Sequence, residues 1–116
     1  MSPDQRRKFF AILGDLSRQL KWPVNGEPTL LHKDDWKMIV TAALMKENRI
    51  AAGLDGGHVV LGLRLRDIFA GLSDDDARRR ASDLIELVTA FALNNGVELS
   101  DPEEAAMRAA YEREQA

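Results

Sequence analysis

Cysteine is absent from the 116-residue sequence, which excludes disulfide bonds and every metal site that needs a thiolate ligand. No apolar run approaches the roughly 18 residues that cross a bilayer. The polar, basic start is not followed by the apolar stretch and cleavage site of a signal peptide. These absences are compatible with a reducing cytoplasm, where we expect the protein to act. Aromatic residues are also scarce, at 6% of the chain, so few side chains are available for stacking on a ligand.

The charged residues divide unevenly along the chain. Residues 1–66 hold 11 Lys and Arg against 7 Asp and Glu, an excess of +4, whereas residues 67–116 hold 5 against 12, or −7; together these give the net charge of −3. A basic front half permits contact with a polyanion. The excess is small beside the basic patches of dedicated DNA-binding domains, so on charge alone two ordinary solvated surfaces are the simpler interpretation. The length predicts one domain, residues 1–116.

The most strongly periodic segment predicts a long amphipathic helix from about Ser73 to Asn95. Ser73, with Asp76 three residues later, is typical of a helix N-terminus, and the acids of the first turn suit the positive end of the helix dipole. Asn95 and Gly96 are typical of a left-handed stop. The rest of the chain must cover its apolar face, and a second copy could help. That face carries Ala81, Leu84, Ile85, Val88, Phe91 and Ala92.

Two further helices are expected in the first half of the chain. Residues 2–4, Ser-Pro-Asp, predict a helix start, and this helix should run to residue 20 or 21. A second helix should begin near residue 32, with acids in its first turn, and end between residues 46 and 48. Their inward faces are predicted to carry Phe9, Ile12, Leu13, Leu16 and Leu20 in the first helix, and Trp36, Ile39, Val40, Ala43 and Leu44 in the second.

The remaining segments are shorter. Residues 23–32, with two prolines and Asn25-Gly26, are predicted to form a loop, and the Val- and Leu-rich runs around residues 55–57 predict a β-hairpin over 50–63. Residues 67–72 form either a helical turn or a loop, 97–99 a brief extended connection, and 102–113 a weak last helix. The expected fold class is α+β, mostly helical, with three to four helices and one β-hairpin. Because an isolated hairpin is marginally stable, we expect a homodimer.

Catalytic chemistry has little support. His32, Asp34 and Asp35 could be read as metal ligands, but their spacing at a helix start is better explained by capping. The three successive acids at 74–76 do not converge on one point, so capping also explains them. We therefore expect no catalytic residue, no metal site, no cofactor and no enzymatic activity. A small metal-dependent nuclease is the alternative that Asp34 keeps open.

Basic residues make a better case for DNA contact, because sequence-independent binding of a single strand needs a track of cations beside stacking surfaces. Arg64 and Arg66 share one face if their segment is extended, and could follow successive phosphates. Residues 78–80 are three successive arginines, and ion pairs with acids of the same helix are the ordinary explanation for this cluster. Phe10 and Trp22 could stack on bases, although a place at the edge of the core is the commoner role. The predicted DNA-binding residues are Arg6, Arg7, Lys8, Arg18, Lys21, Lys37, Arg64, Arg66, Arg78 and Arg79.

Four blocks of the sequence resemble the NinB (Orf) recombination proteins of lambdoid phages. The first, residues 4–22, reads DQRRKFFAILGDLSRQLKW, and the second, residues 34–44, reads DDWKMIVTAAL. The third is VVLG at 59–62. The fourth is DLIELVTAF at 83–91, followed by GV at 96–97 and SD at 100–101. No block is specific alone, but four in the same order and at similar spacing are. Members of the family carry a further N-terminal segment with strands before the first block; this chain starts at that block, so a sheet, dimer contact or DNA surface supplied there would be missing.

The resemblance implies a phage or prophage recombination mediator that acts in the cytoplasm of a bacterial host. Such proteins bind single-stranded DNA as dimers and help a host recombinase to load onto strands covered by single-strand-binding protein. The implied partners are therefore single-stranded DNA, these two host proteins and a second copy of the chain. A protein-interaction adaptor that docks a host protein through the acidic back half, without binding DNA, is the alternative function that the residues leave open.

Overall fold

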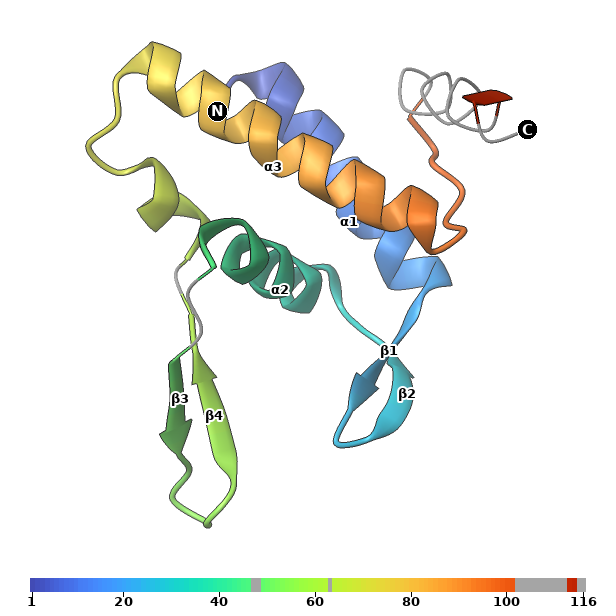
Figure 1. The fold of residues 1–116 in the computed structure, drawn as a ribbon, viewed down its shortest axis with the longest axis vertical. Helices are drawn as coiled ribbons and strands as arrows, with labels where there is room; N and C mark the ends of the chain where they lie inside the picture. The colour runs from blue at the N-terminus through green and yellow to red at the C-terminus, as the bar shows by residue number, and fades with distance from the viewer. Residues whose placement is uncertain (47–48, 63, 102–112, 115–116) are drawn as a thin grey trace.

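The computed structural model describes residues 1–46, 49–62, 64–101 and 113–114. Within these residues three α-helices form the body of the molecule, and two β-hairpins stand out from it on one side (Figure 1). The expected α+β, mostly helical fold is confirmed, while the predicted last helix at 102–113 falls almost wholly outside the described residues. The elements are α1 (Pro3–Gln19), β1 (Lys21–Val24), β2 (Glu27–Leu30), α2 (Lys33–Met45), β3 (Arg49–Ala52), β4 (His58–Leu61), the 3-10 helix η1 (Leu65–Phe69) and α3 (Asp74–Asn94).

The apolar faces of the three helices meet in one core. α1 packs against both α2 and α3, and α2 also packs against α3. The predicted stripes are confirmed except at Ala43, which is exposed. The stripe residues buried in the core are Phe9, Ile12, Leu13, Leu16, Trp36, Val40, Ala81, Leu84, Val88 and Ala92. The stripe residues partly buried at its edge are Leu20, Ile39, Leu44, Ile85 and Phe91. None of the described helices is both long and apolar enough to cross a bilayer.

Helix α1 begins with a reciprocal cap, as the sequence predicts. The Ser2 hydroxyl accepts a hydrogen bond from the Gln5 backbone N–H (3.1 Å), and the Gln5 side-chain oxygen accepts one from the Ser2 N–H (3.0 Å). Pro3 occupies the first helical position, where its missing N–H has no consequence. The helix ends at Gln19, shortly before Pro23. Its first turns therefore have a defined start, from which Arg6 and Phe10 extend toward α2.

The prediction of a loop at residues 23–32 is wrong, because β1 and β2 form a second antiparallel hairpin there. Asn25 (φ 51°) and Gly26 (φ 80°) supply the two left-handed residues of a tight hairpin turn. Pro23 lies directly opposite Pro28. Since proline has no N–H, this pair must take the position of an antiparallel ladder that exchanges no hydrogen bonds. Both prolines thus fit a two-stranded ladder that they would break elsewhere.

The predicted hairpin over 50–63 is confirmed, with β3 paired to β4 in a register that sets Arg49 opposite Leu61 and Ala52 opposite His58. Its turn is tightened by Asp55, whose carboxylate accepts a hydrogen bond from the Gly57 N–H (3.1 Å). This hairpin extends away from the helices (Figure 1). Its large apolar side chains are consequently exposed, namely Ile50, Leu54, Val59 and Leu61.

Helix α3 has the predicted ends. The Ser73 hydroxyl accepts a hydrogen bond from the Asp76 N–H (3.2 Å), and Gly96 takes a left-handed conformation (φ 73°) just beyond the C-cap. Of the two possibilities for residues 67–72, the helical turn is confirmed, although it starts earlier, as η1. Arg80 ties η1 to α3, because its guanidinium donates a hydrogen bond to the Ile68 carbonyl (2.6 Å).

The segment after α3 returns along α1. Val97 and Leu99 are buried in the core, as is Asp15 of α1. The Asp15 carboxylate accepts hydrogen bonds from the backbone N–H (2.9 Å) and the hydroxyl (3.2 Å) of Ser100. Gln19 exchanges two hydrogen bonds of 2.8 Å with the Glu98 backbone. Residues 97–99, predicted to be extended, form no strand with any described residue and are held by side chains instead.

Replacing Leu84 by alanine should lower the free energy of unfolding by about 2–5 kcal/mol, because the side chain is fully buried where the three helices meet. Urea denaturation followed by circular dichroism measures the change. Leu87→Ala is the matched control on the same helix, since Leu87 is 36% exposed; it should cost less than about 1 kcal/mol. Equal losses for the two variants would contradict the packing described.

Candidate nucleic-acid interface

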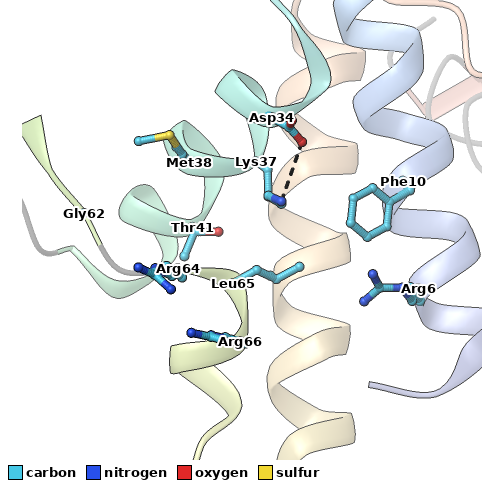
Figure 2. Close-up of a pocket in the computed structure, with 10 residues that line it drawn as sticks. All are labelled: Arg6, Phe10, Asp34, Lys37, Met38, Thr41, Gly62, Arg64, Leu65 and Arg66. Atoms are coloured by element: carbon cyan, nitrogen blue, oxygen red, sulfur yellow. Dashed lines mark ion pairs between the residues drawn. The ribbon is translucent and has the colours of Figure 1, made fainter.

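A groove of about 550 Å³ lies where α1, α2 and the start of η1 come together (Figure 2). α1 contributes two residues to it and α2 contributes four. The rest come from the segment that links β4 to η1 and from the first two residues of η1. η1 packs against α2, which holds this segment at the groove. The groove is lined by Arg6, Phe10, Asp34, Lys37, Met38, Thr41, Gly62, Arg64, Leu65 and Arg66.

Four cations from three parts of the chain converge on this groove. Lys37 is paired with Asp34, at 3.6 Å between Nζ and Oδ1, and Asp34 is the one acid among the lining residues. The guanidinium groups of Arg6, Arg64 and Arg66 form no ion pair with the part of the chain that the structure describes. The groove therefore carries a net positive charge, which favours an anionic ligand.

Phe10 lies beside two of these cations. The Arg6 guanidinium carbon is 4.9 Å from the centre of the Phe10 ring, and the Lys37 nitrogen is 6.0 Å from it. The ring also meets Phe9 edge-to-face, at 5.4 Å between centroids. Phe10 thus packs at the edge of the core, in the commoner of its two predicted roles, and its π-electrons attract two groove cations.

Arg64 and Arg66 reach the groove by a different route from the predicted one. The expectation assumed an extended segment, but Arg64 is the cap of η1 and Arg66 lies within it. Asp67 closes this turn, since its carboxylate accepts a hydrogen bond from the Arg64 N–H (3.0 Å) and its own N–H donates to the Arg64 carbonyl (2.9 Å). Both arginines nevertheless line the same groove, together with the intervening Leu65.

The groove continues beyond these arginines. A second hollow of about 330 Å³ shares Arg6, Leu65 and Arg66 with the first, and its remaining lining comes from Met1, Phe69 and Ala70. The shared residues therefore lie between two neighbouring depressions. An elongated track of this kind suits an extended chain better than a compact ligand.

Three of the predicted DNA-binding cations on α1 are engaged in ion pairs within the protein. Arg7 bonds Asp4 (2.9 Å) and the buried Asp101, and hydrogen bonds to these carboxylates raise the pKa of Arg7 above its ordinary value. The same Arg7 hydrogen bond lowers the pKa of Asp4. Arg18 bonds the buried Asp15 at 2.5 Å, and Lys8 lies 3.6 Å from Asp4. Arg7 and Arg18 therefore neutralise buried acids.

The other three predicted cations lie away from the groove. Lys21 is in β1, and Arg78 and Arg79 are on exposed positions of α3. Arg79 lies 3.5 Å from Asp76, which agrees with the ordinary explanation of this cluster as ion pairs within the helix. Of the ten predicted residues, the structure thus brings Arg6, Lys37, Arg64 and Arg66 together.

Of the residues considered as metal ligands, His32 and Asp35 cap the start of α2, and the Asp34 carboxylate pairs with Lys37. The His32 imidazole accepts a hydrogen bond from the Asp34 N–H (3.2 Å), and the Asp35 carboxylate accepts one from the His32 N–H (3.2 Å). Over the described ranges, no three His, Asp or Glu side chains are grouped so as to hold a metal ion. Trp22, the other candidate for stacking, packs against Trp36 and Phe91, with ring centroids 5.5 and 5.3 Å away.

Sequence reasoning missed Thr41, which lies in the groove one helical turn after Lys37. Because Lys37 and Thr41 are four residues apart in a predicted helix, the sequence could have placed both on one face of α2. Burial of the Thr41 hydroxyl, in contrast, depends on how the elements pack in three dimensions, so no local pattern could have indicated it.

Comparison with known proteins gives a consistent result. The NinB protein family model matches residues 1–100. Protein ninB of Escherichia phage lambda is 34% identical over 100 residues, and protein ninB of Salmonella phage P22 is 35% identical over 103 residues. Each alignment covers 86% of this chain and 60% or 61% of the relative, so the chain spans about three fifths of the length of these relatives.

A solved structure named NinB shares the fold. It superposes with a TM-score of 0.61 at 32% sequence identity, over 97% of this chain and 71% of the other. The family match, the identity to the phage proteins and the common fold confirm the resemblance carried by the four sequence blocks, and the chain belongs to the NinB family.

Proposed function

We propose that the groove between α1, α2 and η1 binds the sugar-phosphate backbone of single-stranded DNA, without sequence preference. The observation that carries this proposal is the convergence of Arg6, Lys37, Arg64 and Arg66, three of them without an ion pair among the described residues. Unpaired cations repel one another, so a protein gains stability when an anionic chain neutralises them.

A single strand fits the groove better than a duplex does. Apolar side chains of Phe10, Met38 and Leu65 lie among the cations, and such a mixture suits phosphates together with unpaired bases. The cations also come from the walls of a depression rather than from a convex ridge or an exposed helix, which is the usual form of an element that enters a duplex groove. Preference for single strands is therefore part of the proposal.

The wider role that we propose is that of a recombination accessory protein, or mediator, in a bacterial host cell infected by a phage or carrying a prophage. By binding the strand, the protein would help a host recombinase to load onto DNA covered by single-strand-binding protein. This role follows from the family resemblance, with the groove as its DNA-binding part. It needs no catalytic step. The Asp35 carboxylate accepts the capping hydrogen bond from the His32 N–H, and the Asp34 carboxylate is paired with Lys37.

Removing two of the groove cations should weaken binding of an oligothymidine by at least tenfold. The variant is Arg64→Gln with Arg66→Gln, and fluorescence anisotropy at low salt measures the affinity. The matched control, Arg78→Gln with Arg79→Gln, makes the same change of net charge on α3, outside the groove, and should change affinity less than threefold. An equal loss of affinity in the two double variants would contradict binding of DNA in the groove. If the unaltered protein binds no DNA, the adaptor function is favoured instead.

Salt should weaken the same complex steeply. If each of the four cations neutralises one phosphate, the logarithm of affinity falls with the logarithm of salt concentration with a slope of about −3, since single strands contribute roughly 0.7 per contact. The Arg64 and Arg66 double variant should reduce that slope by about 1.4. An affinity that does not change with salt would exclude a backbone-binding site.

We also propose that the protein acts as a homodimer in which the β3–β4 hairpin contacts the second copy. An isolated two-stranded hairpin is marginally stable in water. This one exposes Ile50 (67%), Val59 (48%) and Leu61 (44%) away from the helices. A further apolar hollow of about 520 Å³, between β1 and α2, is a second surface that could receive a partner's side chains. Together they would bury surface that a monomer leaves in water.

Light scattering should therefore give twice the chain mass for the unaltered protein. Ile50→Asp should give a monomer, because a charge in an apolar interface is costly to bury. Lys46→Asp is the control, since it adds acidic charge at the end of α2, before the hairpin, and should remain dimeric. A monomeric unaltered protein would contradict this assembly while leaving the DNA-binding test unaffected.

A further inference from the structure

Thr41 has a buried hydroxyl without a hydrogen-bond partner. The residue has no exposed surface, and its Oγ1 atom is bonded to no group of the described structure. Buried polar side-chain atoms nearly always have a partner, because burying one without compensation is unfavourable. Trp36 Nε1 is the second such atom, but it does not line the groove. Thr41 does line the groove, so its unpaired hydroxyl belongs to the candidate site.

The surroundings of this hydroxyl are those of a phosphate-binding position. In Figure 2 the Thr41 oxygen points toward the space between Lys37 and Leu65, with Arg64 on the other side of the residue. A phosphate seated among these cations would accept a hydrogen bond from a threonine hydroxyl, one of the groups that commonly bind DNA phosphates.

We infer that the Thr41 hydroxyl donates a hydrogen bond to a backbone phosphate held by Lys37 and Arg64. The inference rests on the proposed single-strand binding and adds one neutral donor to the site. It assigns Thr41 a direct contact with the ligand, and it supplies a partner for a hydroxyl that has none among the described residues.

The Lys37 side chain beside the hydroxyl is held only weakly. Lys37 is 31% exposed and its ion pair with Asp34 is 3.6 Å long, in a region where Asp34 is 70% exposed. Such a surface pair is weak. A phosphate entering the groove competes with Asp34 for the ammonium group. Because Thr41 has no exposed surface, the side chains around it must shift before a phosphate reaches its hydroxyl.

The competing explanation is a structural hydroxyl. A threonine within a helix can donate its hydrogen bond to the carbonyl of the preceding turn, and a small rotation of the side chain would allow this at Thr41. The two explanations differ in their consequences for stability. A hydroxyl that bonds the helix contributes to folding, whereas one that waits for a phosphate does not.

Thr41→Val separates the two, because it keeps the shape of the side chain and removes the hydroxyl. Thr41→Ser is the matched control that keeps the hydroxyl. Binding of an oligothymidine is measured by fluorescence anisotropy over a range of salt, and the thermal midpoint is measured by circular dichroism. We expect Thr41→Val to bind roughly tenfold more weakly, with an unchanged salt slope and a midpoint that is not lowered. Thr41→Ser should bind as the unaltered protein does.

Several outcomes would overturn the inference. If Thr41→Val binds normally, the hydroxyl makes no contact with DNA. If it loses both affinity and thermal stability, the hydroxyl is structural. If Thr41→Ser weakens binding as much as Thr41→Val does, the methyl group and its packing are responsible. If the unaltered protein shows no salt-dependent binding of DNA, the proposed function itself is overturned. This measurement comes before any variant is made, so the two failures are distinguishable.

Discussion

The rest of the structure depends on the burial of helix α1 between α2 and α3. Phe9, Ile12, Leu13 and Leu16 have no exposed surface, so one side of this helix is entirely committed to the core. The consequence for the site is geometric. Arg6 and Phe10 stand one turn apart at the margin of that buried side, where α2 approaches, and they therefore form one wall of the groove. The same packing that stabilises the helices gives the groove its wall.

Acidic residues decide which cations are free to bind a ligand. Asp15 and Asp101 are buried, and a buried carboxylate is costly unless it is paired, so each requires an arginine. Arg18 and Arg7 meet that need and thereby hold the segment after α3 against α1. The groove contains a single acid, Asp34, against four cations. The chain as a whole is acidic, yet the groove is locally positive, whereas Arg7, Arg18 and Arg79 are engaged in ion pairs elsewhere.

The helices and the second hairpin could be predicted because their signals are local. A cap at Ser2, a cap at Ser73, a stop at Gly96 and a turn at Gly56 each act within a few residues. The first hairpin was missed because proline usually excludes a strand, and the pairing of Pro23 with Pro28 that permits one is a matter of register. The ten predicted cations could be sorted only in part, because the pairs of Lys8, Arg18 and Arg79 are with acids three or four residues away, whereas another pair is not local. Arg7 and Asp101 are far apart in sequence, so their pairing requires the fold.

Several polar groups of the groove lack a partner among the described residues, whereas many polar side chains elsewhere are paired; Trp36 Nε1 is a buried exception outside the groove. Arg80 bonds a carbonyl of η1, Gln19 bonds the segment after α3, and His32 caps α2. In the groove, three guanidinium groups have no ion pair with a described residue, and the hydroxyl of Thr41 has no partner. Burying the Thr41 hydroxyl without a partner is unfavourable for the fold alone. The deficit is explained if an anionic chain completes it, and four cations beside one donor correspond in chemistry to the phosphates of a nucleic acid strand.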